Sequence, residues 1–150
     1  MTTTGSTADK TSLFRHSPIS LFAAGFISVL VFQMGAWSIL HALGLMPPQP
    51  FGYAATQPLG VPQIWSFAFW GGLWGLVYGL VERYFPEGPL YYVAAFLFGA
   101  IAPVLVLWFI VFPLKGRPIA AGWQLIPMID QIIFHGCFGL GIGVLLKWRS

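Results

Sequence analysis

The stretch that decides the fold is FAFWGGLWGLVYGLVER, Phe67–Arg83, which carries no charge before its last two residues. Gly71, Gly75 and Gly79 recur at every fourth position, so on a helix they form one bare stripe. Glycine inside a helix costs roughly 1 kcal/mol relative to alanine in water. In lipid the same stripe lets a second helix approach closely. We therefore predict a transmembrane helix whose glycine zipper faces a partner helix.

The composition places the whole chain in the membrane class. It has 150 residues, of which 57% are hydrophobic, 17% aromatic and 7% charged. A soluble domain carries about 25% charged residues. Four long apolar runs account for most of the chain, and no soluble domain of useful size remains between them. We predict an all-α integral membrane protein with four transmembrane helices.

The segments outside the runs set the boundaries. Residues 1–18 are expected to be a disordered cytoplasmic tail, and residues 19–150 the transmembrane domain. Met46–Gln63 holds five prolines and no charge, which excludes a helix there, and we expect this loop to lie across the mouth of the bundle. The tight turn Tyr84–Pro89 should make the second and third helices antiparallel neighbours, and Pro103 should kink the third. The helices are expected at about 19–45, 64–83, 90–112 and 127–147.

Positive charges predict the orientation in the membrane. With both termini in the cytoplasm, five Lys and Arg residues lie on the cytoplasmic side and two on the outer side, as the positive-inside rule favours. The net charge of +3 therefore reports topology, and we expect no nucleic-acid partner. The cytoplasmic five are Lys10, Arg15, Arg83, Lys147 and Arg149, and the outer two are Lys115 and Arg117.

A shift of 64 residues aligns the two halves of the chain without a gap and matches several glycines. If the halves are a tandem duplication, each is a two-helix hairpin and both have the same orientation. The second and fourth helices would then form a close glycine pair at the centre. The alternative is that so biased a composition produces matches freely. The glycines expected at helix contacts are Gly71, Gly75, Gly79, Gly99, Gly136, Gly139 and Gly143.

Asp130 is the only acidic residue inside an apolar run, and a carboxylate in the membrane interior is a functional candidate. It lies near the start of the fourth helix, on the side of the membrane that carries Lys115 and Arg117. A salt bridge to one of these residues is the simpler interpretation. The other is contact with an ion, a proton or a substrate.

Two histidines and two amides complete the candidate polar site. Gln131 and His135 are four residues apart and share a face of the fourth helix, while His41 lies at a similar depth in the first. Two histidines at one level could ligate a haem, hydrogen-bond a quinone or relay protons with Asp130. The alternative is that each histidine bonds a backbone carbonyl. Gln33, in the middle of the first helix, is expected to bond a neighbouring helix.

No motif for enzymatic chemistry is present. We find no nucleotide-binding motif, no metal-ligand spacing, and no nucleophile beside a base. Cys137 lies in an apolar run and is expected to be inert packing. The sequence thus favours a protein that is not an enzyme and predicts no metal. It predicts no cofactor beyond the haem alternative at His41 and His135.

Three stretches, FWGGLWG from Phe69, LFGAIAP from Leu97 and PLKGRP from Pro113, resemble those of small four-helix inner-membrane proteins of proteobacteria. These proteins are uncharacterised. The resemblance spans most of the chain after residue 18. It implies a multi-pass protein of the bacterial inner membrane and carries no activity and no site residues.

Three functions follow as hypotheses. The first is an accessory or scaffold subunit that packs against another membrane protein or against itself, because small and aromatic helix faces are abundant and polar ones are few. The second is a small oligomeric transporter or channel that uses the polar cluster near the outer leaflet. The third is a haem- or quinone-binding membrane component.

Overall fold

The computed structural model describes residues 15–46, 50–52, 54–56 and 59–149. Within these residues, four helices are long and apolar enough to cross a membrane, as expected. Most of the predicted disordered tail, residues 1–14, lies outside the described residues. In chain order the elements are α1 (Pro18–Ser28), η1 (Val29–Gln33), α2 (Met34–Ala42), β1 (Ala55–Thr56), β2 (Val61–Pro62), α3 (Gln63–Val81), η2 (Glu82–Tyr84), α4 (Pro89–Val106), η3 (Leu107–Val111), α5 (Phe112–Leu114), η4 (Ile119–Trp123) and α6 (Leu125–Arg149).

Local signals explain where two of the long helices start. The Ser17 side chain accepts a hydrogen bond from the Ser20 N–H at 3.2 Å, and Pro18 follows in the first turn of α1. Gly88 takes φ 73° directly before Pro89, where α4 begins. The tight turn predicted between the second and third helices therefore forms, but these helices do not pack along each other as expected: α3 packs on α1, and α4 packs on α6.

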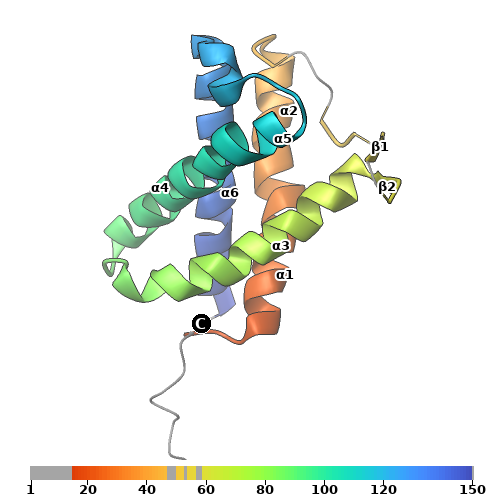
Figure 1. The fold of residues 1–150 in the computed structure, drawn as a ribbon. Helices are drawn as coiled ribbons and strands as arrows, with labels where there is room; N and C mark the ends of the chain where they lie inside the picture. The colour runs from red at the N-terminus through yellow and green to blue at the C-terminus, as the bar shows by residue number, and fades with distance from the viewer. Residues whose placement is uncertain (1–14, 47–49, 53, 57–58, 150) are drawn as a thin grey trace, which may run out of the picture.

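The four spans are arranged in the order α3, α1, α6, α4 (Figure 1). The first span, α1–η1–α2, packs beside α6, while α3 crosses α1 and α4 crosses α6. The start of α1, the end of α6 and the α3–α4 turn lie at one end of the bundle, which we call the terminal end. The connections 43–62 and 115–124 lie toward the opposite end, the loop end.

Glycine contacts build the α1–α3 crossing. A Cβ placed on Gly25 would meet the Gly71 carbonyl oxygen and would lie 3.1 Å from the Cα of Gly75. On α3, a Cβ on Gly72 would lie 2.5 Å from the Phe22 ring. Gly71 and Gly75 of the stripe predicted on α3 thus lie against α1.

A second crossing joins α4 to α6 in the same way. A Cβ on Gly139 would lie 2.8 Å from the Cα of Gly99, and one on Gly136 would lie 2.5 Å from the Phe96 ring. The expectation that the second and fourth helices form the central glycine pair is therefore wrong. Between α3 and α6, the Tyr78 side chain reaches Gly143. A Cβ added to Gly143 would lie 3.0 Å from the Tyr78 hydroxyl oxygen.

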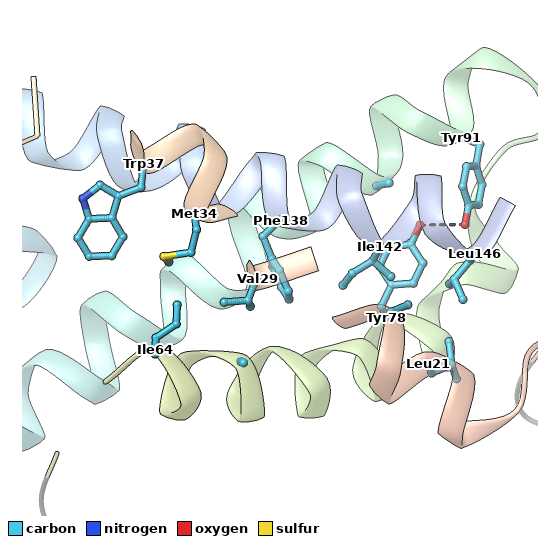
Figure 2. Packing of buried hydrophobic residues seen from close by; sticks show 13 residues of the cluster. Leu21, Val29, Met34, Trp37, Ile64, Tyr78, Tyr91, Phe138, Ile142 and Leu146 are labelled. Carbon is cyan, nitrogen blue, oxygen red and sulfur yellow. Dashed lines mark hydrogen bonds between the residues drawn. The ribbon is translucent and has the colours of Figure 1, made fainter. Parts of the chain in front are cut away.

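The buried row between the helices runs along the bundle from Trp37 to Tyr91 (Figure 2). Phe138 and Ile142 of α6 lie in its middle, 2% and 0% exposed. The Ser28 hydroxyl donates to the Phe138 carbonyl at 2.6 Å and so joins α1 to α6. By contrast, rings separate α3 from α4: the ring centroid of Phe98 lies 6.2 Å from that of Trp74 and 5.2 Å from that of Tyr78.

Two of the spans contain a π-helical segment, η1 and η3. Pro103 is buried inside α4, which continues through it. The Leu107 N–H, where η3 begins, bonds both the Pro103 and the Val104 carbonyls. Such segments are among the features that bend helices, and η1 has no proline to reveal it in the sequence.

The two connections at the loop end contain structure that the sequence did not predict. In the first, Ala55 pairs with Pro62 and Thr56 with Val61 in an antiparallel hairpin. In the second, Ala120 and Ala121 take φ of 52° and 54°. Alanine in this left-handed region costs roughly 1–2 kcal/mol. Ala120 is fully buried and packs with the cluster around Trp108, and such packing can hold strained backbone in place.

Ala121→Gly is therefore expected to stabilise the protein. Glycine relieves the left-handed strain, and after its own loss of backbone entropy the net gain is about 0.5–1 kcal/mol. The measurement is thermal unfolding in mild detergent. Ala94→Gly, in the regular helix α4, is the control and should lose about 1 kcal/mol. Equal losses from both variants would contradict the expectation.

Candidate functional site

A buried carboxylate at the terminal end is the centre of a polar cluster. Glu82 is 1% exposed, and its Oε1 accepts a hydrogen bond from the Tyr91 hydroxyl at 2.6 Å. The Tyr78 hydroxyl donates in turn to the Tyr91 hydroxyl at 2.9 Å (Figure 2). His16 Nε2 lies 3.4 Å from Glu82 Oε1. We call these four residues the Glu82 cluster.

Four separate segments bring these side chains together. Tyr78 comes from the last turns of α3, Glu82 from η2, Tyr91 from the first turn of α4 and His16 from the residues before α1. From α6, Lys147 places its Nζ 4.4 Å above the Tyr91 ring. A hydrogen-bonded carboxylate shared by so many segments fixes how the helix ends sit together.

One oxygen of this carboxylate differs from the other. Within the described residues, Glu82 Oε2 is buried and accepts no hydrogen bond. Leaving a buried acceptor unpaired is costly, roughly 1–3 kcal/mol and more for a charged group. Loss of one of the remaining contacts of Glu82 should therefore lower the free energy of unfolding more than loss of an ordinary surface hydrogen bond.

Sequence reasoning missed this cluster because Glu82 and Arg83 end an apolar run, where charges normally face water. One signal could have found it. Tyr78 and Glu82 are four residues apart, so they share a face of the helix. Tyr78 is also buried in the midst of the glycine stripe, between Gly75 and Gly79.

At the loop end, the structure divides the predicted polar site between two faces of α6. Gln131 faces the third span, where its Oε1 accepts a hydrogen bond from the Trp108 indole N–H of η3. His135 lies one turn further, with its Nδ1 2.8 Å from the Gln131 carbonyl oxygen. His135 therefore donates to a backbone carbonyl, which was the alternative to a ligand-binding role for the histidines.

Asp130 belongs to the other face of α6. It begins a buried series at four-residue spacing that continues through Phe134, Phe138, Ile142 and Leu146. The Phe134 ring stacks on Trp37 of α2, with centroids 5.9 Å apart. Asp130 thus faces the first span, and Gln131 and His135 face α4.

His41 and Gln33 both belong to the first span. His41 Nδ1 lies 2.9 Å from the Met46 carbonyl oxygen, so this ring also donates to backbone. Gln33 ends η1 and is 7% exposed. No described hydrogen bond or ring contact joins His41 to His135.

The expected salt bridge of Asp130 is not formed. Neither Lys115 nor Arg117 lies within 4.0 Å of the Asp130 carboxylate. Arg117 instead lies over the Phe112 ring, 4.4 Å from its centroid. Asp130 is 6% exposed, and no described residue gives it a hydrogen bond. It is therefore a buried carboxylate without a described partner.

The chemistry open to these sites is limited by their composition. Within the described residues, no group of three His, Cys, Asp or Glu side chains is arranged to hold a metal ion. Cys137 is a free, half-buried thiol on α6. In comparisons with known proteins, no family model, no curated protein and no solved structure matches this chain.

Proposed function

We propose that this chain is an accessory or scaffold subunit of the bacterial inner membrane that packs against another membrane protein or against a second copy. Both termini lie in the cytoplasm in this proposal, which puts the terminal end and its Glu82 cluster on the cytoplasmic side. The balance of five positive residues against two supports that orientation.

The observation that carries the proposal is the open order of the four spans. α3 packs along α1, and α4 along α6, so that each outer helix keeps a face that packs on no other described helix. The aromatic side chains Trp65, Phe69 and Trp70 of α3 are 47%, 50% and 57% exposed. The first two also touch α1, through the Phe26 and Phe22 rings. Rigid aromatic side chains are enriched where proteins bind one another. The interior, by contrast, is filled by tight glycine and aromatic contacts.

We also propose that the chain is a tandem repeat of two hairpins in the same orientation. Two sets of contacts support this. Gly25 meets Gly75 as Gly99 meets Gly139, and the Phe22 ring covers Gly72 as the Phe96 ring covers Gly136. These pairs relate the first span to the third by 74 residues and the second to the fourth by 64. The connection 43–62 is ten residues longer than 115–124, which accounts for the difference.

Purification of the native complex tests the accessory role. The full chain is extracted from its own membranes with a mild detergent, and the proteins that remain bound are quantified by mass spectrometry. We expect a membrane protein in near-equal amount, or a homo-oligomer, and we expect Phe69→Ala with Trp70→Ala to release it. Trp148→Ala, 82% exposed on α6, is the control. A lone monomer would contradict the proposal.

A small oligomeric transporter or channel is the second candidate, favoured by the unpartnered Asp130 beneath the loop end. Four helices rarely enclose a pathway, so oligomers are required. A pure homo-oligomer that moves solutes across liposomes and loses this flux in Asp130→Asn would favour it over the accessory role.

A further inference from the structure

A groove lies between the start of the first span and the end of α6, at the terminal end of the bundle. Its volume is about 490 Å³. Small-molecule sites in proteins typically measure about 300–1,000 Å³. The groove is therefore large enough to hold a ligand, and its lining indicates which kind.

The inner part of the groove is apolar. The Ser28 hydroxyl holds α1 against α6 through its bond to the Phe138 carbonyl. Between this contact and the terminal end, Ala23 and Ala24 form part of the α1 wall, and Leu145 forms part of the α6 wall. Alanine side chains end at Cβ and so leave the space between the two helices unfilled. The result is an apolar channel along α1.

The outer part of the groove is polar and offers hydrogen-bond donors. The Ser17 hydroxyl donates to the Ser20 hydroxyl oxygen at 2.8 Å, and no described hydrogen bond uses the Ser20 hydroxyl proton. His16 also lines the groove and directs its Nε2 toward Glu82 Oε1. When the ring is protonated, as in an ion pair with Glu82, the Nδ1–H is a second donor without a described acceptor. These donors suit an oxygen-rich ligand.

The charges at this end favour an anion. Among residues 15–149, the terminal end carries four Lys and Arg residues against two Glu residues: Arg15, Arg83, Lys147 and Arg149 against Glu82 and Glu87. No acidic side chain of the described residues lines the groove. Glu82, which contacts His16, is 1% exposed and lies outside the lining.

The depth of the groove identifies the class of anion. Trp148 lines its rim and is 82% exposed, and tryptophan is enriched where the membrane meets water. A ligand there reaches the interface with its polar part and the hydrocarbon with its apolar part. Basic pockets between transmembrane helices bind the headgroups of anionic lipids. An anionic head beside an apolar chain is the chemistry of such a lipid.

We propose that this groove binds one anionic phospholipid. The phosphate lies at His16 and Ser20, where the free donors are, and one acyl chain follows the apolar channel past Ala23 toward Ile27. The lipid would thus fill the space that the alanines leave between α1 and α6. This site does not depend on the accessory role proposed above.

The test is photo-cross-linking of the full chain in nanodiscs of phosphatidylcholine. The probe is phosphatidylglycerol with a diazirine on one acyl chain, added as a minor component, and mass spectrometry locates the labelled residues. We expect labels to concentrate on the groove at Ala23, Ile27 and Leu145. An excess of unlabelled phosphatidylglycerol should reduce this labelling at least tenfold. The same excess of phosphatidylethanolamine, which has no net charge, should leave it unchanged.

A variant that fills the groove provides a second readout. Ala23→Leu should reduce labelling of the groove at least tenfold. Ala94→Leu makes the same change at a half-buried position of α4 outside the groove and should be labelled as the native chain is. Unfolding in detergent establishes that both variants are folded.

Three results would overturn the proposal. They are labels spread evenly over the four spans, equal competition by phosphatidylethanolamine, and unchanged labelling in a folded Ala23→Leu. The first two are measured on the native chain, so they decide the question even if Ala23→Leu does not fold.

Discussion

Gly139→Ala is expected to break the packing of α4 on α6. The added Cβ would lie 2.7 Å from the Gly99 nitrogen and 2.8 Å from its Cα, and it would also meet the Ala95 carbonyl oxygen. These are backbone atoms, so no side chain can turn aside and the helices must separate. We expect a loss of about 3 kcal/mol, at the upper end of the cost of overpacking. The measurement is unfolding of the purified protein in detergent.

A matched change at a glycine without close neighbours provides the control. A Cβ on Gly35 of α2 would meet nothing within 4 Å. Gly35→Ala should therefore be neutral or stabilise by about 0.5–1 kcal/mol, because alanine is the better helix former. If Gly139→Ala unfolds at the same point as the native chain, the close α4–α6 contact does not exist.

Tyr91→Phe is expected to have the next largest effect. The substitution removes the 2.6 Å hydrogen bond to Glu82 Oε1 and the acceptor of the Tyr78 hydroxyl. Glu82 Oε2 has no hydrogen bond to compensate, so a 1% exposed carboxylate would retain His16 as its described polar contact. Hydrogen bonds to charged groups contribute about 1.5–3 kcal/mol, and we expect a loss near the upper value.

Tyr92→Phe removes the same hydroxyl from the neighbouring position and serves as the control. Tyr92 is 39% exposed, and its expected change lies within about 0.5 kcal/mol. Both variants are compared by unfolding in detergent. A loss from Tyr91→Phe no larger than that from Tyr92→Phe would show that the Glu82 cluster does not hold the terminal end together.

The number and approximate extent of the helices could be predicted because long apolar runs and proline breaks are properties of the chain alone. The helix that each glycine stripe contacts could not. A bare stripe shows that some helix approaches, and the contact surface of α1 contains Gly25 and Leu21, which form no visible stripe. The gapless alignment of the halves also concealed this surface, because it placed Gly25 opposite Pro89 instead of Gly99.

The polar sites were predictable in part. Asp130 was identified because a lone carboxylate in an apolar run is conspicuous. The sequence analysis grouped Asp130 with Gln131 in one polar site, but the structure places them on different faces of α6. One step along a helix turns the side chain by about 100° and so toward a different neighbour. Glu82 was overlooked because a charge at the end of a run is normally solvated. Only the fold shows that His16 and Tyr91 converge on it, with Lys147 above the Tyr91 ring.

The order α3, α1, α6, α4 underlies both the exposed faces of the outer helices and the repeat that we propose. The most direct test requires no substitution. In protein labelled only at its 18 glycines, nuclear Overhauser effects report which glycine Hα atoms lie close together. We predict contacts between Gly25 and Gly75 and between Gly99 and Gly139, whose backbones meet. Contacts between Gly75 and Gly139, which would place α3 directly on α6, would contradict this arrangement.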